Sequence, residues 1–380
     1  MSERYDIAIV GAGPAGASLA IRLAMAGKRV ILAEKETFPR QKLCGEFISP
    51  ECLTHFAEIG VLDDMRAAGG TELRETVFYS RSGRGVAVPS AMFGSMHKHA
   101  LGLSRAEMDL RLLQGARAAG TEVREGTSGS VMIDEGRAVG LQLRKAGIPP
   151  EQVIASLIVD ATGRTRALSR RNGAPALKAR LIGFKTHATG VEIPSESCEI
   201  FSYRGGYGGT SRVEGGLHNI CFIASANDVR RLGSDAEAVF REIVCSNRRA
   251  AQVFRDVRLG SEWLAVPIDR FGRGELSPMP GMMTVGDAAS FIDPFTGSGM
   301  LLALESARIA AASLDGPGEV SAEYQRRYSA AFDRRLRICS WIRRASLVPF
   351  FTEAVVFGLG LSTSMRSRLV TATRSGALET

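Results

Sequence analysis

The first forty residues alternate between apolar runs and glycine-rich breaks in a way that predicts a strand, a helix and a second strand. The strand-like segments 6–10 and 29–34 contain the short, continuous apolar runs 7–10 and 30–33, and 14–26 carry apolar side chains at helical spacing. Short apolar runs on either side of a glycine turn and a helix are typical of a βαβ unit with a buried parallel sheet. The chain therefore begins as an α/β fold.

Later apolar segments extend this first sheet. Residues 105–119 have helical spacing, 122–124 are strand-like, 131–143 alternate as a hairpin, and 154–159 form another apolar run. Because alternating strands and helices favour one shared, mainly parallel sheet, we expect these segments to join the N-terminal unit.

The stretch from 180 to 270 has a different pattern, in which alternating β-branched and aromatic residues are separated by Gly-Gly turns. Alternation with a period of two predicts half-buried strands of an antiparallel sheet. We expect the clearest strands at 199–203, 207–213 and 217–224. Residues 77–101 contain two more strand-like runs, which we assign to the same second sheet.

A glycine motif, Gly11-x-Gly13-x-x-Gly16, lies between the first strand and the first helix. Gly11 allows a tight turn, Gly13 lets backbone N–H groups approach a pyrophosphate, and Gly16 permits close packing of helix on strand. Glu34 ends the second strand, where a carboxylate accepts hydrogen bonds from an adenosine ribose and repels a 2′-phosphate. This context favours dinucleotide binding over a plain loop.

A second glycine-rich region lies near residue 290. Gly286 and Asp287 follow an apolar strand, so the carboxylate at the strand end can bind the hydroxyls of a sugar alcohol. Residues 294–299 lead into a helical run at 300–314. The first N–H groups of that helix would face a flavin ring that becomes negative on reduction.

A third motif, Asp160-Ala161-Thr162-Gly163, follows the run 154–159 and stands between the other two along the chain. No single motif is specific. In this order, the three predict one extended FAD molecule, bound at its pyrophosphate, its ribityl chain and its redox-active ring.

With these motifs the chain resembles, over residues 1 to about 315, the FAD-dependent superfamily of aromatic hydroxylases, flavin halogenases and geranylgeranyl reductases. The resemblance implies that Glu34 holds the ribose, that Arg105, in the pattern of residues 104–109, contacts the FAD, and that Asp287 binds the ribityl chain. It implies a Rossmann-type FAD-binding domain and an oxidoreductase activity, but it does not select one reaction.

Cys44 lies in the segment 40–46, which is similar to the Lys-x-Cys-Gly segment beside the flavin of geranylgeranyl reductases. A lone cysteine is more often a small core residue. Within the resemblance we place Cys44 near the ring, with Gly45 giving close backbone approach. Two roles stay open for Cys44, tuning the flavin or shaping the pocket.

Three differences from the family motifs reduce the number of reactions that the resemblance supports. Ala161 and Arg164 replace residues of the hydroxylase motif that serves FAD and NADPH. Residues 207–212 lack the tryptophan and Phe-Pro of the reductase tunnel signature. The two tryptophans, Trp263 and Trp341, do not form the halogenase pattern. Direct NADPH use, prenyl reduction and tryptophan-type halogenation are each weakened.

The resulting predictions for the site are explicit. The residues expected to bind the cofactor are Gly11, Gly13, Pro14, Ala15, Gly16, Glu34, Lys35, Arg40, Cys44, Gly45, Arg105, Asp160, Ala161, Gly163, Gly286, Asp287, Pro294, Gly297, Ser298, Gly299 and Met300. Those expected beside the reacting atoms are Cys44, Pro294, Gly297 and Ser298. His97 and His99 lack a third ligand, so we expect them on a strand face near the substrate pocket and expect no metal.

The domain organisation follows from the order of these segments. We expect an FAD-binding domain from 1–75, 102–180 and 271–315, and an antiparallel-sheet substrate domain inserted into it. The inserted domain comprises 76–101 and 181–270, and 316–380 form a helical C-terminal region.

Composition changes the picture little. The chain has 380 residues, a formal charge of +8 and six cysteines without metal-ligand spacing, which indicates about two domains in a reduced, cytoplasmic protein. The arginines are dispersed and no nucleic-acid motif accompanies them, so we expect no nucleic acid partner. Residues 346–361 are apolar but too short to span a bilayer.

The C-terminal region carries Trp341, Phe350, Phe351 and Phe357 beside arginines. Three interpretations stay open: a lid over a lipophilic pocket, a peripheral contact with a membrane surface, and plain helix packing.

The leading functional hypothesis is a monooxygenase that hydroxylates or epoxidises a lipophilic, phenolic, polyketide- or terpenoid-like molecule through a flavin hydroperoxide. The alternatives are reduction of a carbon–carbon double bond and an FAD-binding scaffold or cyclase without net redox chemistry. NADPH, NADH, an external reductase or a ferredoxin are the candidate electron donors.

Overall fold

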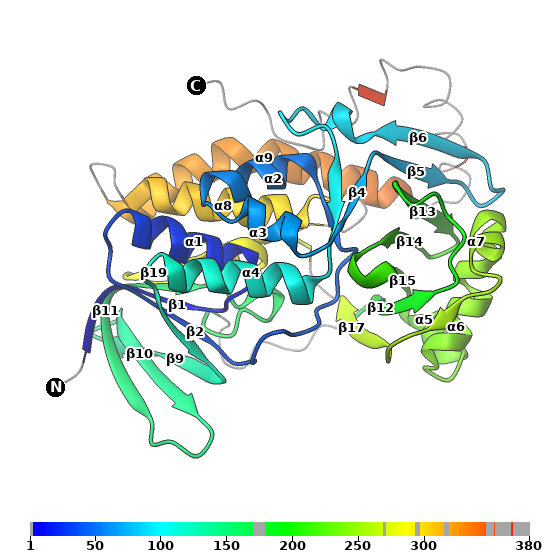
Figure 1. Cartoon of the computed structure of the whole chain (residues 1–380). Coiled ribbons are helices and arrows are strands. Elements are labelled where there is room, and N and C mark those ends of the chain that lie inside the picture. The colour runs from blue at the N-terminus through cyan, green and yellow to red at the C-terminus, as the bar shows by residue number, and fades with distance from the viewer. Residues whose placement is uncertain are drawn as a thin grey trace.

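The computed structural model describes residues 3–169, 179–268, 271–292, 297–314 and 319–346, together with residues 353, 366 and 367. Two sheets lie at opposite ends of an elongated molecule, and long helices cover the first of them (Figure 1). This is the α/β fold expected from the sequence, with a second, mainly antiparallel sheet.

The first sheet contains five parallel strands and an antiparallel hairpin. Its parallel strands, in spatial order, are β8 (Glu122–Glu125), β2 (Val30–Glu34), β1 (Glu3–Val10), β11 (Glu151–Asp160) and β19 (Met282–Thr284). The hairpin of β9 (Thr127–Asp134) and β10 (Arg137–Lys145) pairs with the start of β11. The βαβ start and the added strands are therefore confirmed.

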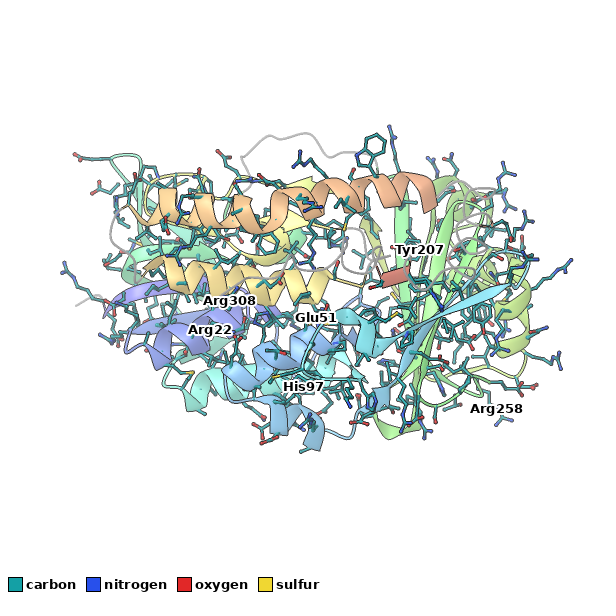
Figure 2. The ribbon with its side chains drawn as sticks, turned by 90° about the horizontal axis from the view of Figure 1, so that it is seen from above. Arg22, Glu51, His97, Tyr207, Arg258 and Arg308 are labelled. Atoms are coloured by element: carbon teal, nitrogen blue, oxygen red, sulfur yellow. The ribbon has the colours of Figure 1, made fainter. Side chains whose placement is uncertain are left out.

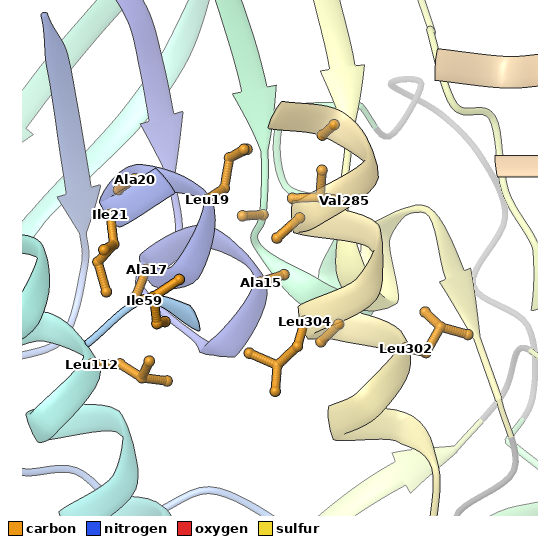
Figure 3. Close-up of a cluster of buried hydrophobic side chains, with 14 of the residues drawn as sticks. Ala15, Ala17, Leu19, Ala20, Ile21, Ile59, Leu112, Val285, Leu302 and Leu304 are labelled. Carbon is orange, nitrogen blue, oxygen red and sulfur yellow. The ribbon is translucent and has the colours of Figure 1, made fainter. Parts of the chain in front are cut away.

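One face of the parallel strands packs against helices. These are α1 (Pro14–Met25), α2 (Pro50–Glu58), α3 (Leu62–Ala67), α4 (Arg105–Ala118), α8 (Gly299–Leu314) and α9 (Val320–Ser346). Figure 3 shows α1 beside α8, with Ala15 and Leu19 of α1 facing Leu304 and Val285. Small alanines on α1 let the two helices approach closely, because interaxial distance follows the size of the side chains at the contact.

The second sheet is built from β16 (Arg258–Leu259), β12 (Leu181–Thr189), β15 (His218–Ser225), β14 (Gly206–Arg212), β13 (Ser197–Tyr203), β5 (Glu75–Tyr79) and β6 (Gly85–Pro89), with β17 (Leu264–Ile268) also paired to β12. Only β5 and β13 run parallel among these pairs. One face packs on α5 (Ala226–Arg231), α6 (Ala236–Glu242) and α7 (Arg248–Val253) through an aromatic core. The other face points back toward the first sheet.

Short strands link the two parts. β3 (Phe47–Ile48), β7 (Ala100–Gly102) and β4 (Thr71–Leu73) form one small sheet, and β18 (Gly272–Arg273) pairs with β20 (Ser290–Phe291). His97 and His99 lie in the irregular segment before β7, so the expectation of a shared strand face was wrong. The expected domain boundaries stay a prediction.

Several positions of the glycine motifs have no room for a side chain, because the chain passes close to other parts of the protein there. A Cβ on Gly16 would lie 1.9 Å from the Gly11 carbonyl oxygen, and one on Gly11 would lie 2.3 Å from that of Ala161. A Cβ on Gly286 would come within 2.7 Å of the Ala15 side chain. The three motifs therefore touch one another, and their order in the sequence becomes one contiguous cluster.

No helix in the described part of the chain is both long and apolar enough to cross a membrane. The α9 helix begins the predicted C-terminal helical region, and Trp341 near its end is 71% exposed. Phe350, Phe351 and Phe357 lie outside the described residues.

We predict that Gly16→Ala lowers the free energy of unfolding by about 1–3 kcal/mol, because the new methyl group overpacks against the Gly11 carbonyl. Gly13→Ala is the matched control, since a Cβ there meets nothing nearer than Arg105 Nη2 at 3.9 Å. Urea unfolding of the cofactor-free protein measures both. Equal losses of stability for the two variants would contradict the crossing argument.

Candidate cofactor and active site

A cavity of about 1070 Å³ lies between the two sheets. Small-molecule sites are typically roughly 300–1,000 Å³, so this one is large enough for an extended ligand. Its walls run from the glycine turn after β1 to the second sheet, where Tyr207, labelled in Figure 2, is one of the lining residues. Segments far apart in the sequence therefore share one space.

The end of the cavity near β1 is rich in cations. The side chains that line it include Lys35, Arg40, Lys42, Arg105 and Arg164. Burial, together with neighbouring Arg40 and Arg105, lowers the pKa of Lys42, which shows how closely these charges are grouped. Grouped cations attract an anion, and a pyrophosphate has the appropriate charge.

Arg105 is fixed at this end by a two-point contact with Asp109 on the same helix. Its Nε and Nη2 donate to the two Asp109 carboxylate oxygens at 2.9 and 2.8 Å. Burial acts against its charge, but Asp109 and the nearby Cys44 thiol raise the pKa of Arg105 overall. The guanidinium is therefore held rigidly beside both Gly13 and Cys44.

Two carboxylates at strand ends also face the cavity. Glu34 at the end of β2 accepts hydrogen bonds from Ala12 N at 2.9 Å and Glu36 N at 3.1 Å, which fixes its orientation. Asp287, just after β19, accepts no hydrogen bond from any described residue. Burial raises the pKa of Asp287, while Arg164 and Arg105 act in the opposite direction. Its oxygens are left for a ligand that carries hydroxyl groups.

Two helices begin at the cavity wall. The α1 helix has Gly13 as N-cap without a side-chain hydrogen bond, and the first turn of α8 lines the cavity at Gly299 and Met300. Unpaired N–H groups at a helix start carry partial positive charge. The open space at Gly13 is the space that a phosphate would fill. These features fit FAD, with the pyrophosphate at α1 and the ring at α8.

The structure brings most of the predicted residues together. Those that line the cavity are Gly11, Gly13, Pro14, Ala15, Glu34, Lys35, Arg40, Cys44, Gly45, Arg105, Ala161, Gly163, Asp287, Gly297, Gly299 and Met300. Pro294 lies outside the described residues.

Gly16, Asp160, Gly286 and Ser298 do not line the cavity. Both Asp160 oxygens are used within the chain, because Oδ1 accepts from Thr162 N at 2.9 Å and Oδ2 accepts from Ser169 N at 3.0 Å. Its carboxylate shapes the loop after β11 and is not available to a cofactor. Gly16 and Gly286 act through backbone packing, and Ser298 is fully buried under the start of α8.

The second sheet contributes a wall that sequence reasoning did not identify. Residues in register across five strands place side chains on the face opposite the aromatic core. One such row is Phe78, Ile200, Gly209, Cys221 and Lys185, and all but Lys185 line the cavity. The next row is Thr76, Cys198, Ser211, Asn219 and His187. The wall is apolar at one end and ends at two basic residues of β12.

Glu46 joins these two basic residues. It is 0% exposed and has a backbone φ of +52°, which is unusual for a residue with a side chain. One carboxylate oxygen accepts from Lys185 Nζ and from Arg105 N at 2.7 Å, and the other contacts His187 Nε2 at 2.6 Å. Lys185 Nζ also donates to Gln41 Oε1 at 2.9 Å. We name Glu46, Lys185, His187 and Gln41 the buried ion cluster.

The proton in the contact between Glu46 and His187 can be placed. Burial alone would raise the pKa of Glu46, but the hydrogen bond from His187 and the charge of Lys185 lower it below the ordinary value. An ionised carboxylate only accepts hydrogen bonds, so Nε2 of His187 carries the hydrogen.

The sequence did contain a signal for this cluster. Glu46 directly follows the Cys44-Gly45 pair, and Lys185 and His187 alternate with Phe184 and Ala188 in one strand. Two basic side chains on one face of an otherwise apolar strand need a buried counter-charge. What the sequence could not give was the partner, because Glu46 and His187 are 141 positions apart.

Comparison with known proteins agrees with this geometry. Residues 4–204 match the model of an FAD binding domain. The chain is 30% identical over 327 residues to a digeranylgeranylglycerophospholipid reductase of Methanosarcina mazei, covering 82% of this chain and 75% of that protein. It is 28% identical over 354 residues to a menaquinone reductase of Mycolicibacterium smegmatis, covering 84% and 78%.

A solved structure also has this fold. The geranylgeranyl bacteriochlorophyll reductase-like protein of Thermoplasma acidophilum superposes with a TM-score of 0.80 at 20% identity, covering 97% of this chain and 96% of that one. At this identity the likeness concerns the fold alone.

We predict that Gly13→Ala weakens FAD binding by roughly 5- to 150-fold, the change in affinity that corresponds to overpacking of about 1–3 kcal/mol. The stability of the cofactor-free protein should hardly change, since the space at Gly13 is open. Fluorescence titration of cofactor-free protein with FAD measures the effect. Wild-type affinity in this variant would show that the phosphates lie elsewhere.

We predict that Glu46→Gln lowers the free energy of unfolding by about 3–5 kcal/mol at neutral pH, because Lys185 loses its buried counter-charge. A carboxylate with a lowered pKa in the folded state stabilises the protein above its unfolded pKa, about 4.3, and this contribution is lost as the pH falls. The difference between wild type and variant should therefore be constant from about pH 8 to about pH 5 and shrink below about pH 4.

Urea unfolding at a series of pH values checks this. A difference that already shrinks at neutral pH would mean that burial, and not the cationic partners, dominates at Glu46.

Proposed function

The chain belongs to the family with the FAD binding domain and is an FAD-dependent oxidoreductase, and we propose that it reduces a carbon–carbon double bond in a lipophilic, isoprenoid-like substrate. The observation that carries this proposal is the position of Cys44. Its thiol lies where the cationic end of the cavity meets the apolar wall of the second sheet.

The apolar end of the cavity supports a lipophilic substrate. Its side chains come from β5, β6, β13 and the turn after β6, and they are Phe78, Val86, Val88, Phe93 and Ile200. Such a wall binds an extended hydrocarbon by removing its surface from water, at roughly 25 cal/mol per Å². It also keeps water from the reacting carbon atoms.

Reduction of a double bond needs a hydride and a proton. FAD, when bound and reduced, supplies the hydride, and the protein must supply the proton at the other carbon. Glu46 N donates to Cys44 Sγ at 3.4 Å, and Arg105 lies against the same sulfur. With these donors on the protein side, the thiol proton of Cys44 is directed to the cavity and can pass to the substrate.

The sequence relatives support the same direction of reaction. The two sequence relatives described above are both named as reductases, one of a digeranylgeranylglycerophospholipid and one of menaquinone. Both names describe substrates with long isoprenoid chains. We therefore place the substrate of this chain in that chemical class.

Oxygenation, the leading hypothesis from the sequence, is the second candidate because the same apolar wall also fits a hydroxylase substrate. Against it, three thiols line the cavity, those of Cys44, Cys198 and Cys221. Burial raises the pKa of Cys198 to about 12, so this thiol stays protonated. Oxidation to sulfenic acid follows thiolate character, so the argument against oxygenation rests on Cys44, whose sulfur would lie beside the oxidant.

We propose that electrons reach the flavin from NADPH, NADH, an external reductase or a ferredoxin. Glu34 accepts backbone hydrogen bonds at the ribose position and selects against a 2′-phosphate on the bound dinucleotide itself. Glu34 therefore does not identify the electron donor, and the reaction should be tested with a chemical reductant in its place.

The test is a single turnover of the FAD-loaded protein, reduced with dithionite without oxygen, on geranylgeraniol and on menaquinone as probes. The quinone ring is reoxidised before analysis, so that only hydrogen added to a carbon–carbon double bond is counted. We expect a product that is heavier by two hydrogens, and by two deuteriums in heavy water, because the flavin hydride and the thiol proton both exchange with solvent. Cys44→Ala should slow this step by about 10²–10⁴-fold, the usual contribution of a general acid. Cys198→Ala, which also removes a thiol from the wall, is the control and should change it little.

A product that appears only with oxygen and gains one oxygen atom would replace the proposal with the monooxygenase. Equal rates in the Cys44 and Cys198 variants would remove Cys44 from the reaction.

A further inference from the structure

The buried ion cluster stands at a junction of three parts of the molecule. Lys185 and His187 come from β12 of the second sheet, and Arg105 N is the first backbone donor of α4, which packs on the first sheet. Glu46 lies between them in the segment that leads from β2 to β3. One carboxylate therefore receives hydrogen bonds from both halves of the protein.

The buried ion cluster costs free energy of folding in two ways, through backbone strain and through burial of charge. A left-handed backbone is strained for a residue with a Cβ, and Glu46 adopts it directly after Gly45. Lys185 is only 1% exposed, and a buried charge loses the stabilisation of water. Apolar side chains of similar size would fill this space without either cost. Strained and buried polar groups of this kind are concentrated at functional sites.

We propose that Glu46 is the positioning residue of the reaction site, and that its contacts with Lys185, His187 and Arg105 N hold Cys44 against the cavity. This inference rests on the proposed function for the role of Cys44 as proton donor. The position of Cys44 itself can be tested without any substrate.

The contacts of Cys44 show how the position is transmitted. Glu46 N donates to Cys44 Sγ, so the backbone of Glu46 and the reacting sulfur move as one unit. Asn219 Nδ2 donates to the Cys44 carbonyl oxygen at 3.2 Å from the second sheet. Asn219 is the register neighbour of His187, and His187 contacts the Glu46 carboxylate. Cys44 is thus held on one side by the backbone of Glu46 and on the other by Asn219, which lies beside His187 in the sheet.

The position matters because proton transfer depends steeply on geometry. A displacement of about 1 Å at a reacting group can cost about 10²-fold in rate. Gly45 has no side chain that could anchor the segment, and no atom beyond the adjacent residues lies within 4 Å of the place where its Cβ would be. The anchoring of this segment comes from its neighbours, and Glu46, the next residue, has the most buried contacts among them.

The chain offers a matched control for a buried ion pair. Glu199 of β13 is also buried, and both its oxygens accept from Arg249, at 2.9 and 2.7 Å, on the opposite face of the same sheet. Glu199→Gln breaks a comparable ion pair without touching the cavity wall. Glu46→Gln and Glu199→Gln can therefore be compared directly.

The first measurement is amide hydrogen exchange of the cofactor-free protein, read by mass spectrometry on the peptide that spans residues 41–48. We expect Glu46→Gln to speed exchange there by about 10- to 100-fold, the loss expected for one hydrogen bond to a charged group. Glu199→Gln should leave this peptide unchanged. Wild-type exchange in the Glu46 variant would overturn the proposal.

The second measurement is the anaerobic single turnover on geranylgeraniol. Glu46→Gln should lower its rate by about 10²-fold, with the affinity for FAD and the half-saturating substrate concentration nearly unchanged, because the variant displaces Cys44 and leaves the binding walls intact. An equal loss in Glu199→Gln, or a change in FAD affinity alone, would show a structural role and overturn the proposal.

The double variant with Glu46→Leu and Lys185→Met keeps the proposal testable if Glu46→Gln does not fold. Replacing both charges with apolar side chains often restores stability. We expect this protein to be folded and still to show fast exchange at 41–48 and slow turnover. Wild-type turnover in the folded double variant would overturn the proposal. If the wild type reduces neither probe while exchange responds as expected, the proposed function fails and the positioning by Glu46 stands.

Discussion

The contact of one buried carboxylate with both halves of the molecule is the constraint on which the site depends. Glu46 accepts hydrogen bonds from β12 of the second sheet and from the start of α4 on the first. The cavity lies between these halves, so its width at Cys44 is set where this carboxylate joins them. Reacting groups must be placed to within a fraction of an ångström. A contact that joins the two walls of the cavity helps to keep them at this fixed spacing.

A second constraint fixes the cofactor end, and it acts through the absence of side chains. Gly11, Gly16 and Gly286 are places where backbone crosses backbone or a neighbouring residue at distances that exclude a Cβ. Gly13 differs, because the space beside it is open toward the cavity. The same motif therefore contains glycines that build the fold and one that leaves room for a ligand.

Much of this was accessible from the sequence, for identifiable reasons. The glycine motifs, Glu34 and Asp287 could be placed because each lies at a strand end, and strand ends of a parallel sheet meet at one edge. Asp160 was assigned to the cofactor by the same logic, but its loop turns back and uses both oxygens. The buried ion cluster could not be found, because pairing Glu46 with β12 requires knowing how the second sheet docks, which no local pattern states.

The charges of the cluster also explain how a rigid anchor can stand beside an apolar wall. Glu46 is ionised and Lys185 is its cationic partner, so the pair adds little net charge to the cavity. A single unpaired charge at this place would draw water toward the reacting carbon atoms, since an isolated ion in an apolar site is strongly unfavourable. A paired cluster gives directional hydrogen bonds to the residue that follows Gly45 and leaves no unpaired charge beside the apolar wall. The wall therefore changes from charged to apolar within one register row, from Lys185 to Cys221 to Ile200 and Phe78.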